Sequence, residues 1–582
     1  MNSDWVYSLF RGVEVKICGS FYSRWDNIQT MAEGGERLAI PIGVKDFKEI
    51  RDDGYYFVDK SELISDIIQD KRKVFLFTRP RRFGKSLNLS MLDAFFNLEY
   101  KGNNWFDGLK INSHPESDRF RNRYPVISLG MKFPDVEDYD LFLAKVRGVL
   151  SRLFANYSYL KDSDKVPENL RELFFGEDPT YFDEQKVRDS ILTLCLMLYK
   201  HHGVKPIVLI DEYDNAINNA YGKGSYSKVT RFISDFYSTT LKDNDYLTFA
   251  VMTGVTQIAK EGIFSGLNNL RVNNIFSVKF DERYGFTESE VKELCTYYGH
   301  PENFGEAKEW YDGYRFGNAD IYNPWSVLFY VKEDFNPETY WAGTSGNDII
   351  DTLLKNADET VLKNLTLLGN GETITRHLVP SISMSDLETE SDAIFSVLAV
   401  AGYLNAVPCG DGHLLSIPNR EMYSVFYEHI RKFVFRSGVD TYAEFLSALE
   451  NCDIKTIEDK LYCFLSDEIP FPMLDREMQY QLIIAMIVLG RTGRYKVTVE
   501  RESGNGRHDI LMEHRYSKYP NIVLEIKKTT KDSDAESERL AHEALEQIHR
   551  KDYFKKLKGT TYLYGIAFNG KKALVLLEKT VL

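Results

Sequence analysis

The sequence has no apolar run long enough for a membrane-spanning helix. Its longest strongly apolar stretch, Leu482 to Leu489, is far shorter than the roughly 20 residues that cross a bilayer. Asp4 stands where the apolar core of a secretory signal would lie. The 6 cysteines form no CxxC pair and never lie at metal-ligand spacing from the 11 histidines. These absences argue against a membrane partner, a disulfide framework and a zinc site, and they predict a cytoplasmic protein.

The composition is that of a globular chain with several domains. Of the 582 residues, 43% are hydrophobic and 27% are charged, so the chain should fold throughout. At roughly 150 residues per domain, this length predicts about three or four domains. The formal net charge of -14 argues against a protein coated in nucleic acid. From Ser466 onward the balance differs, because Lys and Arg slightly outnumber Asp and Glu there.

The first half of the chain alternates between strand-like and helix-like segments. Residues 1–36 are interpreted as an N-terminal extension, and the alternation occupies residues 37–284. The predicted strands and helices are, in chain order, 74–77, 85–97, 126–129, 139–155, 184–199, 207–210, 227–240 and 247–252. Strands that alternate with helices predict an α/β core with a mainly parallel sheet that helices cover on both faces.

The second half divides into four further parts. Residues 285–385 form short, aromatic-rich segments that predict a helical lid region. Residues 386–437 give helix, strand, turn, strand and helix, the order of a winged-helix-like module. A linker is predicted over 438–465, and residues 466–582 form a compact α/β unit of the usual domain size.

A candidate phosphate site follows the first predicted strand. The segment TRPRRFGKS places Gly84, Lys85 and Ser86 where a helix begins. Backbone N–H groups at a helix start attract phosphate, a lysine reaches the terminal phosphates and a serine hydroxyl completes a magnesium shell. A second strand ends in Asp211 and Glu212, which can hold magnesium and polarise an attacking water. The two signals together predict a nucleotide site.

This loop departs from the usual phosphate-loop pattern. Arg79 stands where a glycine is expected, and Pro80 has no N–H to offer a phosphate. The alternative interpretation is that the loop arginines form a basic solvated turn and that the acidic pair only caps a strand. Thr253, at the end of the fourth predicted strand, can either sense the terminal phosphate or be a satisfied strand-end hydroxyl.

Seven segments between Ile40 and Trp341 carry a resemblance to a known family. They are YYFVDKSELI, LFTRPRRFGKSLNLSML, VLIDEYDNAI, MTGV, GLNNL, WYDGY and YNPWS. They resemble the AAA-ATPase-like family of bacterial proteins, whose loop likewise reads RPRRFGKS. The resemblance implies an ATPase in which the arginine-rich loop binds phosphate. Residue by residue, it assigns phosphate and magnesium binding to Gly84, Lys85 and Ser86, magnesium to Asp211, and the role of general base to Glu212. The predicted ATP-binding set consists of Arg82, Phe83, Gly84, Lys85, Ser86, Asp211 and Thr253, with Ser86 and Asp211 at the magnesium ion.

A second candidate site lies near the C-terminus. Asp509 begins one predicted strand, and Glu525 and Lys527 lie on one face of the next. If these strands pair as a hairpin, the two carboxylates can share a Mg²⁺ or Mn²⁺ ion. A lysine beside that ion can position a water and stabilise charge on a scissile phosphate. The cluster therefore predicts metal-dependent phosphodiester hydrolysis, whereas an isolated ExK motif is usually surface charge pairing.

The order of elements around this cluster resembles the PD-(D/E)XK nuclease superfamily over residues 466–582. The resemblance adds Glu477 on the preceding helix and Gln547 on the following helix to the catalytic set, beside Asp509, Glu525 and Lys527. The first motif reads ExxYQ in place of ExxYH. Further basic residues can line a surface that binds a nucleic-acid backbone, or can simply be solvated: Lys528, Lys531, Arg550, Lys551, Lys555, Lys556 and Lys558.

These patterns predict an ATP-dependent regulator fused to a metal-dependent nuclease. ATP would switch the lid and the winged-helix-like module, which would license the C-terminal site. DNA is the expected nucleic acid, and defence against phage or other foreign DNA is the expected setting by analogy. The alternative is a nucleotide-driven binding switch whose nuclease-like domain is inactive and holds nucleic acid or a partner protein. A homo-oligomer is compatible with either function.

Overall fold

The computed structural model describes most of the chain between residues 37 and 581. The described residues are 37–133, 136–242, 244–257, 270–341, 359–369, 371–379, 381, 393–426, 439–468, 477–488, 494–499, 502–503, 506–507, 509–514, 518–529, 531, 533–551, 554 and 557–581. The predicted N-terminal extension lies outside them. None of the helices in these ranges is long and apolar enough to span a membrane.

The N-terminal part is built on a five-stranded sheet in the order β2-β3-β4-β1-β5. All of its neighbouring strands run parallel. The strands are β1 (Val74–Thr78), β2 (Val126–Gly130), β3 (Ile207–Asp211), β4 (Ala250–Gly254) and β5 (Leu270–Asn273). Strands β1 and β4 are buried along their whole length, as a sheet covered on both faces requires. The predicted parallel α/β core is confirmed.

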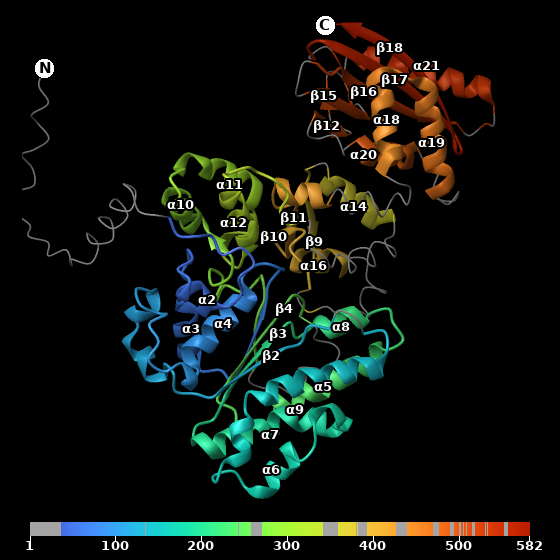
Figure 1. Ribbon diagram of the computed structural model, residues 1–582. Coiled ribbons are helices and arrows are strands. Elements are labelled where there is room, and N and C mark those ends of the chain that lie inside the picture. Colours follow the sequence, from blue (N-terminus) through green and yellow to red (C-terminus); the bar gives the residue numbers. More distant parts are fainter. Residues whose placement is uncertain are drawn as a thin grey trace, which may run out of the picture.

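Side chains of β1 alternate between two hydrophobic cores, one on each face of the sheet. Phe75 and Phe77 enter the first core, and Val74 and Leu76 enter the second. The first face is covered by α2 (Phe47–Asp52), α3 (Glu62–Asp70) and α4 (Lys85–Phe96). The second is covered by α5 (Tyr139–Ala155), α6 (Glu168–Phe175), α7 (Glu184–His202), α8 (Asn215–Ala220) and α9 (Tyr226–Leu241). Figure 1 shows the two helix layers on opposite sides of the strands.

The lid, defined here as residues 285–341, contains a small sheet as well as helices. Its helices are α10 (Glu288–Tyr297), α11 (Phe304–Tyr311) and α12 (Pro324–Lys332). Strands β6 (Phe286–Thr287), β8 (Ala319–Tyr322) and β7 (Tyr314–Phe316) form a sheet that the prediction of short helices missed. The turn between β7 and β8 contains Gly317, whose φ of +50° favours glycine. The lid aromatics Tyr311, Tyr314 and Tyr322 are buried.

The winged-helix-like module, described over 393–426, has the predicted order of elements. It contains α16 (Ala393–Val400), the hairpin of β10 (Asn405–Cys409) and β11 (Gly412–Ser416), and a helix over 420–426. Strand β9 (Ile374–Arg376) joins the hairpin as a third strand, and α14 (Glu359–Gly369) precedes it. Side chains of this module belong to the same hydrophobic core as α2, α3 and α4. The module is therefore packed onto the ATPase-like part.

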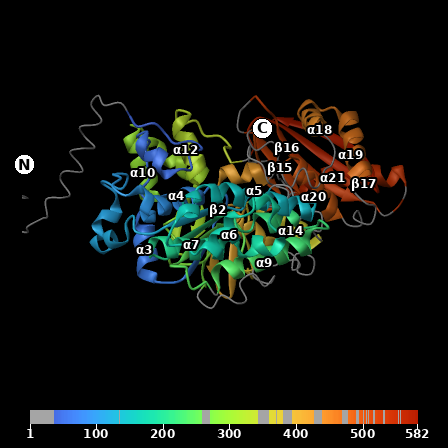
Figure 2. The same cartoon turned by 60° about the horizontal axis from the view of Figure 1, so that its bottom comes forward.

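The C-terminal unit is a mixed five-stranded sheet with helices on both faces. The sheet order is β12-β15-β16-β17-β18, with β16 and β17 parallel and the other pairs antiparallel. The strands are β12 (Tyr495–Val499), β15 (Ile510–His514), β16 (Asn521–Lys528), β17 (Thr560–Asn569) and β18 (Lys572–Val581). Helices α20 (Glu477–Val488) and α21 (Asp534–Lys551) contribute to cores on opposite faces. Figure 1 shows this unit apart from the parallel sheet, and in Figure 2 it again lies at one side of the molecule.

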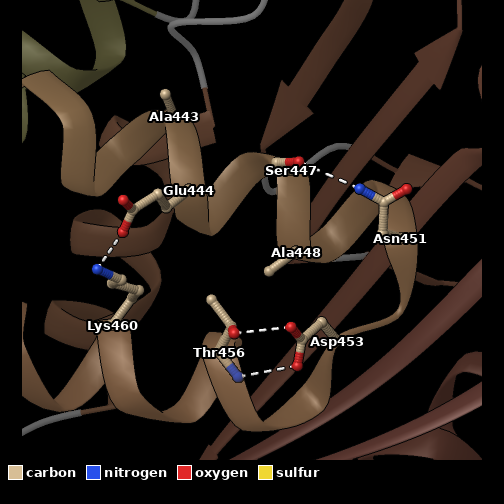
Figure 3. A pocket seen from close by; sticks show the side chains of 8 residues that line it. All are labelled: Ala443, Glu444, Ser447, Ala448, Asn451, Asp453, Thr456 and Lys460. Atoms are coloured by element: carbon tan, nitrogen blue, oxygen red, sulfur yellow. Dashed lines mark hydrogen bonds and ion pairs between the residues drawn. The ribbon is translucent and has the colours of Figure 1, made fainter.

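The segment that we predicted as a linker forms two helices of this unit. They are α18 (Val439–Asn451) and α19 (Ile454–Glu468). Phe445 and Phe464 pack edge to face and lie in the same core as the C-terminal sheet. Figure 3 shows the groove between the helices, across which Glu444 and Lys460 form an ion pair. The structure thus differs from the predicted linker because the apolar faces of both helices are buried against the sheet.

Candidate functional site

The phosphate loop, residues 78–86, connects the end of β1 to the start of α4. Gly84 is the N-cap of α4 and has a φ of +79°, a conformation that side chains with a Cβ rarely adopt. Arg82 also has a positive φ, of +71°. These two turns direct the chain into α4, so that the first backbone N–H groups of the helix face the loop. The loop therefore has the backbone form expected of an anion site at a helix start.

Lys85 extends across this loop and is almost completely buried. Its ammonium donates to the carbonyl of Arg79 at 2.9 Å and to that of Pro80 at 2.7 Å. Burial lowers the pKa of Lys85 to about 8, and the nearby charge of Asp211 opposes that shift. The loop carbonyls thus hold the ammonium of Lys85 within the phosphate loop.

Ser86, Asp211 and Thr253 converge at the ends of neighbouring elements. The Ser86 hydroxyl donates to Oδ2 of Asp211 at 2.5 Å. The Thr253 hydroxyl donates to Oδ1 of the same carboxylate at 2.5 Å. Because β3 and β4 are parallel neighbours, their carboxyl ends meet beside the start of α4. The structure brings these three predicted residues together, and hydroxyl and carboxylate oxygens suit Mg²⁺.

Glu212 follows Asp211 with a φ of +54°. Its Oε1 lies 3.9 Å from the ammonium of Lys132. Its Oε2 is buried and has no hydrogen-bond partner among the described residues. Burial raises the pKa of this carboxyl above its ordinary range. A partly buried carboxylate with a raised pKa and an available oxygen fits the predicted role of general base.

Arg79 is fully buried, so the interpretation of the loop arginines as a solvated turn fails for this residue. Its guanidinium donates to the carbonyls of Thr78 at 2.9 Å and Asn273 at 2.8 Å, and to that of Phe280 at 3.3 Å. The guanidinium carbon lies 5.3 Å from the ring centroid of Tyr284. Arg79 therefore joins the loop to β5 and to the chain that enters the lid.

Arg82 and Phe83, both predicted to bind ATP, contact the lid. The guanidinium carbon of Arg82 lies 3.8 Å from the ring centroid of Trp325, and its Nη1 donates to the carbonyl of Tyr340 at 3.4 Å. Phe83 is buried, with its ring centroid 5.0 Å from that of Tyr314. The role of both residues in ATP binding stays a prediction, and their observed contacts join the phosphate loop to the lid.

The sequence reasoning missed Asp214, which organises the chain after β4. Its buried carboxylate accepts from the N–H groups of Val255 at 3.0 Å and Thr256 at 2.7 Å. A Cβ on Gly254 would lie 2.5 Å from Oδ1 of Asp214, so only glycine permits this approach. The second aspartate of VLIDEYD was the available signal.

In the C-terminal unit, Asp509 and Glu525 lie side by side on paired strands. Strands β15 and β16 are antiparallel with Ile510 opposite Leu524, which places Asp509 beside Glu525. Oδ2 of Asp509 accepts from the N–H of Ile526 at 2.7 Å. The predicted hairpin approach of the two carboxylates is therefore present.

Burial raises the pKa of both carboxyls, and the charge of Asp509 raises that of Glu525 further. Glu525 is fully buried, and Oε2 of its carboxylate has no hydrogen-bond partner among the described residues. Its Oε1 accepts from the side-chain amide of Gln547. Two buried carboxylates that repel each other fit a divalent cation, which would remove the repulsion. The cation would also bind the Glu525 oxygen that has no partner among the described residues.

Lys527 and Glu477 adjoin this pair. The ammonium of Lys527 lies 3.9 Å from Oε1 of Glu525 and 3.6 Å from Oε1 of Glu477. Oε2 of Glu477 accepts from the N–H of Lys528 at 3.3 Å. All five predicted residues of this site thus converge. In the described part of the chain, no group of three or more His, Cys, Asp or Glu side chains is arranged to hold a metal ion.

Gln481, which the sequence reasoning noted only as a departure from ExxYH, has a role in the site. Its side-chain amide hydrogen-bonds to Asp509 and opposes the rise in the pKa of that carboxyl. The side chain is almost completely buried. Among the predicted basic residues, Lys551 acts on the site, because its charge lowers the pKa of Glu525. Lys555 and Lys556 lie outside the described residues.

Together these features define a phosphate-loop α/β domain joined to a mixed-sheet domain with a buried carboxylate pair. Comparison with known families finds the same two domains. Residues 41–264 match the predicted AAA-ATPase family, and residues 475–578 match the PD-(D/E)XK nuclease superfamily. The chain therefore contains an AAA-ATPase-like domain followed by a PD-(D/E)XK nuclease superfamily domain. It is also similar to a protein of Azotobacter chroococcum mcd 1 named "Uncharacterized protein in vnfD 5'region", with 28% identity over 399 residues, 66% of this chain and 68% of that protein.

Proposed function

We propose that this protein binds and hydrolyses ATP at the phosphate loop and cleaves DNA at a metal-dependent site in its C-terminal unit. The observation that carries the proposal is the convergence of Asp509, Glu525 and Lys527 in a chain whose Asp211 also adjoins a phosphate loop. Nucleotide state then controls the C-terminal site through the lid and the winged-helix-like module. A role in defence against foreign DNA, such as phage DNA, is proposed from the domain combination alone.

At the ATPase site, the chain supplies groups for binding and for one proton transfer. Lys85 and the N–H groups at the start of α4 bind the terminal phosphates. Ser86 and Asp211 would hold a magnesium ion, which neutralises charge on the phosphates when it is bound. Glu212 accepts the proton of the attacking water, and its raised pKa brings it toward neutral pH for that task.

At the nuclease site, Asp509 and Glu525 would hold Mg²⁺ or Mn²⁺, which activates water and stabilises the scissile phosphate when it is bound. The ammonium of Lys527 places a positive charge beside Glu525, where charge develops on that phosphate. Gln547 orients Glu525 through their hydrogen bond. Glu477 orients Lys527 through their ion pair.

The ATPase proposal is tested by calorimetry of ATP with magnesium. Lys85→Ala should abolish binding, because the change removes the charge that reaches the terminal phosphates. Glu212→Gln should bind ATP but hydrolyse it more slowly, because it lacks the proton acceptor. Equal ATP affinity in wild type and Lys85→Ala would remove the nucleotide claim.

The nuclease proposal is tested by cleavage of plasmid, linear and single-stranded DNA with Mg²⁺ or Mn²⁺. Asp509→Ala, Glu525→Ala and Lys527→Ala should each eliminate cleavage, and any single loss should equal the loss from all three, because the residues act as one unit. Cleavage that persists in Asp509→Ala would assign the activity to another site.

A second candidate is a nucleotide-driven switch whose nuclease-like domain binds nucleic acid or a partner without cleavage. The first motif favours it, since Gln481 stands where the superfamily motif has histidine and Glu477 is paired with Lys527. Wild-type protein that binds DNA, yet cleaves neither DNA nor RNA with any nucleotide, would select this function.

A further inference from the structure

Two charged side chains from distant parts of the chain hold the same peptide group of the lid. Arg82 of the phosphate loop donates to the carbonyl of Tyr340 at 3.4 Å. Glu421 accepts from the N–H of Trp341 at 2.8 Å. Because this carbonyl and this N–H belong to one planar peptide unit, the guanidinium and the carboxylate polarise it from opposite ends.

Glu421 is a fully buried carboxylate in the helix over 420–426. Besides Trp341, it accepts from the hydroxyl of Ser326 on α12, at 2.7 Å and 3.0 Å from its two oxygens. Burial raises the pKa of Glu421 to about 7, and the positive charge of Arg82 opposes that shift. The winged-helix-like module and the lid therefore meet at this carboxylate, and the phosphate loop reaches the same lid peptide through Arg82.

The same module contacts the phosphate loop directly at a second point. Gly402 follows α16 with a φ of +88°, and a Cβ on this residue would lie 2.8 Å from Cβ of Pro80. This close packing couples the position of Pro80 in the loop to that of the module.

We infer that Glu421 is a positioning residue of the proposed ATP site: it fixes the lid peptide that Arg82 binds, and thereby ties the winged-helix-like module to the phosphate loop. Nucleotide phosphates compete for the Arg82 guanidinium with this lid peptide and with the nearby negative charge of Glu421. The inference rests on the proposed ATP binding at this loop and adds how that binding reaches the rest of the molecule.

The competition follows from the chemistry of the arginine. A guanidinium presents a planar fork of N–H donors that suits a phosphate as well as a carboxylate. Once a phosphate recruits Arg82, Glu421 keeps its buried position without the opposing charge, which disfavours the docked arrangement of the module. By linkage, anything that removes the charge of Glu421 must raise nucleotide affinity.

The test is a double-mutant cycle on the full-length protein, with the affinity for ATP and magnesium measured by calorimetry. Glu421→Gln keeps the shape of the side chain and should raise ATP affinity by at least about fivefold, the lower end of usual allosteric coupling. In an Arg82→Gln background the same change should have no effect, because the competed group is gone. A merely structural role of Glu421 would give equal effects in both backgrounds.

Glu309→Gln is the matched control. Glu309 forms an ion pair with Arg420 across the same boundary between lid and module, but both side chains are half exposed. This variant removes one negative charge and should leave ATP affinity unchanged. If the wild type binds ATP and Lys85→Ala does not, an unchanged or lowered ATP affinity in Glu421→Gln overturns this inference and leaves the proposed function standing. Absence of ATP binding in the wild type overturns the proposed function instead.

Hydrogen exchange of the wild-type protein gives a test that needs no variant to fold. Addition of a non-hydrolysable ATP analogue with magnesium should speed hydrogen exchange of the Trp341 N–H and of the helix over 420–426. The reason is that the peptide between Tyr340 and Trp341 then loses the hydrogen bond from Arg82. Exchange that stays the same at saturating analogue would overturn the inference.

Discussion

The carboxylate at the ATPase site and the carboxylate at the nuclease site are satisfied in opposite ways. Asp211 receives a protein hydroxyl on each oxygen, from Ser86 and from Thr253. Glu525 is fully buried beside Asp509, and one of its oxygens has no partner among the described residues. Asp211 is thus satisfied by neighbouring side chains, whereas the carboxylate pair of the C-terminal unit keeps a repulsion that a cation would relieve.

This difference shows what each site demands of its surroundings. Neutral donors can hold a carboxylate in a fixed place at little electrostatic cost, so the fold prepares the ATPase site before any ligand arrives. A buried pair of like charges destabilises its domain until a cation binds. Removal of a charged group should therefore lower the free energy of unfolding of the ATPase-like region. Without metal, it should raise the free energy of unfolding of the C-terminal unit.

The largest effect should come from Arg79→Met in the ATPase-like region. The change keeps an unbranched side chain but leaves the carbonyls of Thr78, Asn273 and Phe280 without their donor. At about 1 to 3 kcal/mol for each unsatisfied buried group, the free energy of unfolding of this region should fall by about 4 kcal/mol. Urea unfolding measures it, with Arg81→Met at an exposed neighbour as the control. A loss below about 1 kcal/mol would show that the loop does not depend on this arginine.

The next largest effect concerns Glu421, a buried carboxylate with neutral donors and one opposing charge. The titratable groups that act on it are Arg82, Tyr311, Tyr314 and Tyr340. Its pKa is about 7 in the folded state against an ordinary 4.5, so its contribution to stability is complete below pH 4.5 and is lost as the pH rises through 7.

The free energy of unfolding of the wild type should accordingly fall by up to roughly 3 kcal/mol between pH 4.5 and pH 8, at about 1.4 kcal/mol for each pKa unit. Glu421→Gln has no ionisable group and should remove this part of the pH dependence. Thermal unfolding of both proteins across this range checks it. Parallel pH profiles for the two proteins would assign the dependence to other groups.

A change of opposite sign is expected at the nuclease site. Without divalent cation at pH 8, Glu525→Gln should raise the free energy of unfolding of the C-terminal unit by roughly 1 to 2 kcal/mol, about one pKa unit of relieved repulsion. With Mn²⁺ at about ten times its Kd, the free energy of unfolding should rise by about 1.4 kcal/mol in the wild type and should not change in the variant. Thermal unfolding with and without Mn²⁺ measures both effects.

Glu513→Gln is the control for this prediction. Glu513 lies on the neighbouring strand β15 with a half-exposed side chain, and its Oε2 lies 4.0 Å from the ammonium of Lys496. Its change should therefore alter neither the stability nor the response to Mn²⁺. A Glu525→Gln protein that is less stable than wild type without metal would contradict the comparison, because the buried pair would then be satisfied by the protein alone.

The sequence predicted elements whose patterns are local. Strand 74–77, the loop up to Ser86 and the acidic end of strand 207–210 could be placed because apolar runs, turn residues and helix starts occupy adjacent positions. The approach of Asp509 to Glu525 also followed from strand alternation and a short hairpin. These features need no knowledge of distant parts of the chain.

The features that escaped prediction depend on distant partners. Arg79 stands beside Arg81 and Arg82 in the sequence, and its burial is set by carbonyls about two hundred positions away. Glu421 has no local motif, because its partners come from α12 and from residue 341. The helices over 439–468 appeared as a linker because their apolar faces are explained only by a sheet that comes later in the chain.

The smallest predicted effect concerns Gln481, which supports the carboxylate pair from α20. Its amide hydrogen-bonds to Asp509 and favours the ionised form that a cation needs. Gln481→Met keeps the length and packing of the side chain but removes the donor, so affinity for Mn²⁺ should fall by about tenfold, as for other groups that orient metal ligands. Gln481→His restores an N–H at the position where the superfamily motif has histidine, and should recover most of the affinity. Titration of Mn²⁺ into each full-length variant measures this, with thermal unfolding in the absence of metal to show that packing is retained. If Gln481→Met binds Mn²⁺ as tightly as wild type, Asp509 is held ionised by its hydrogen bond from Ile526 and by Lys527 without help from α20.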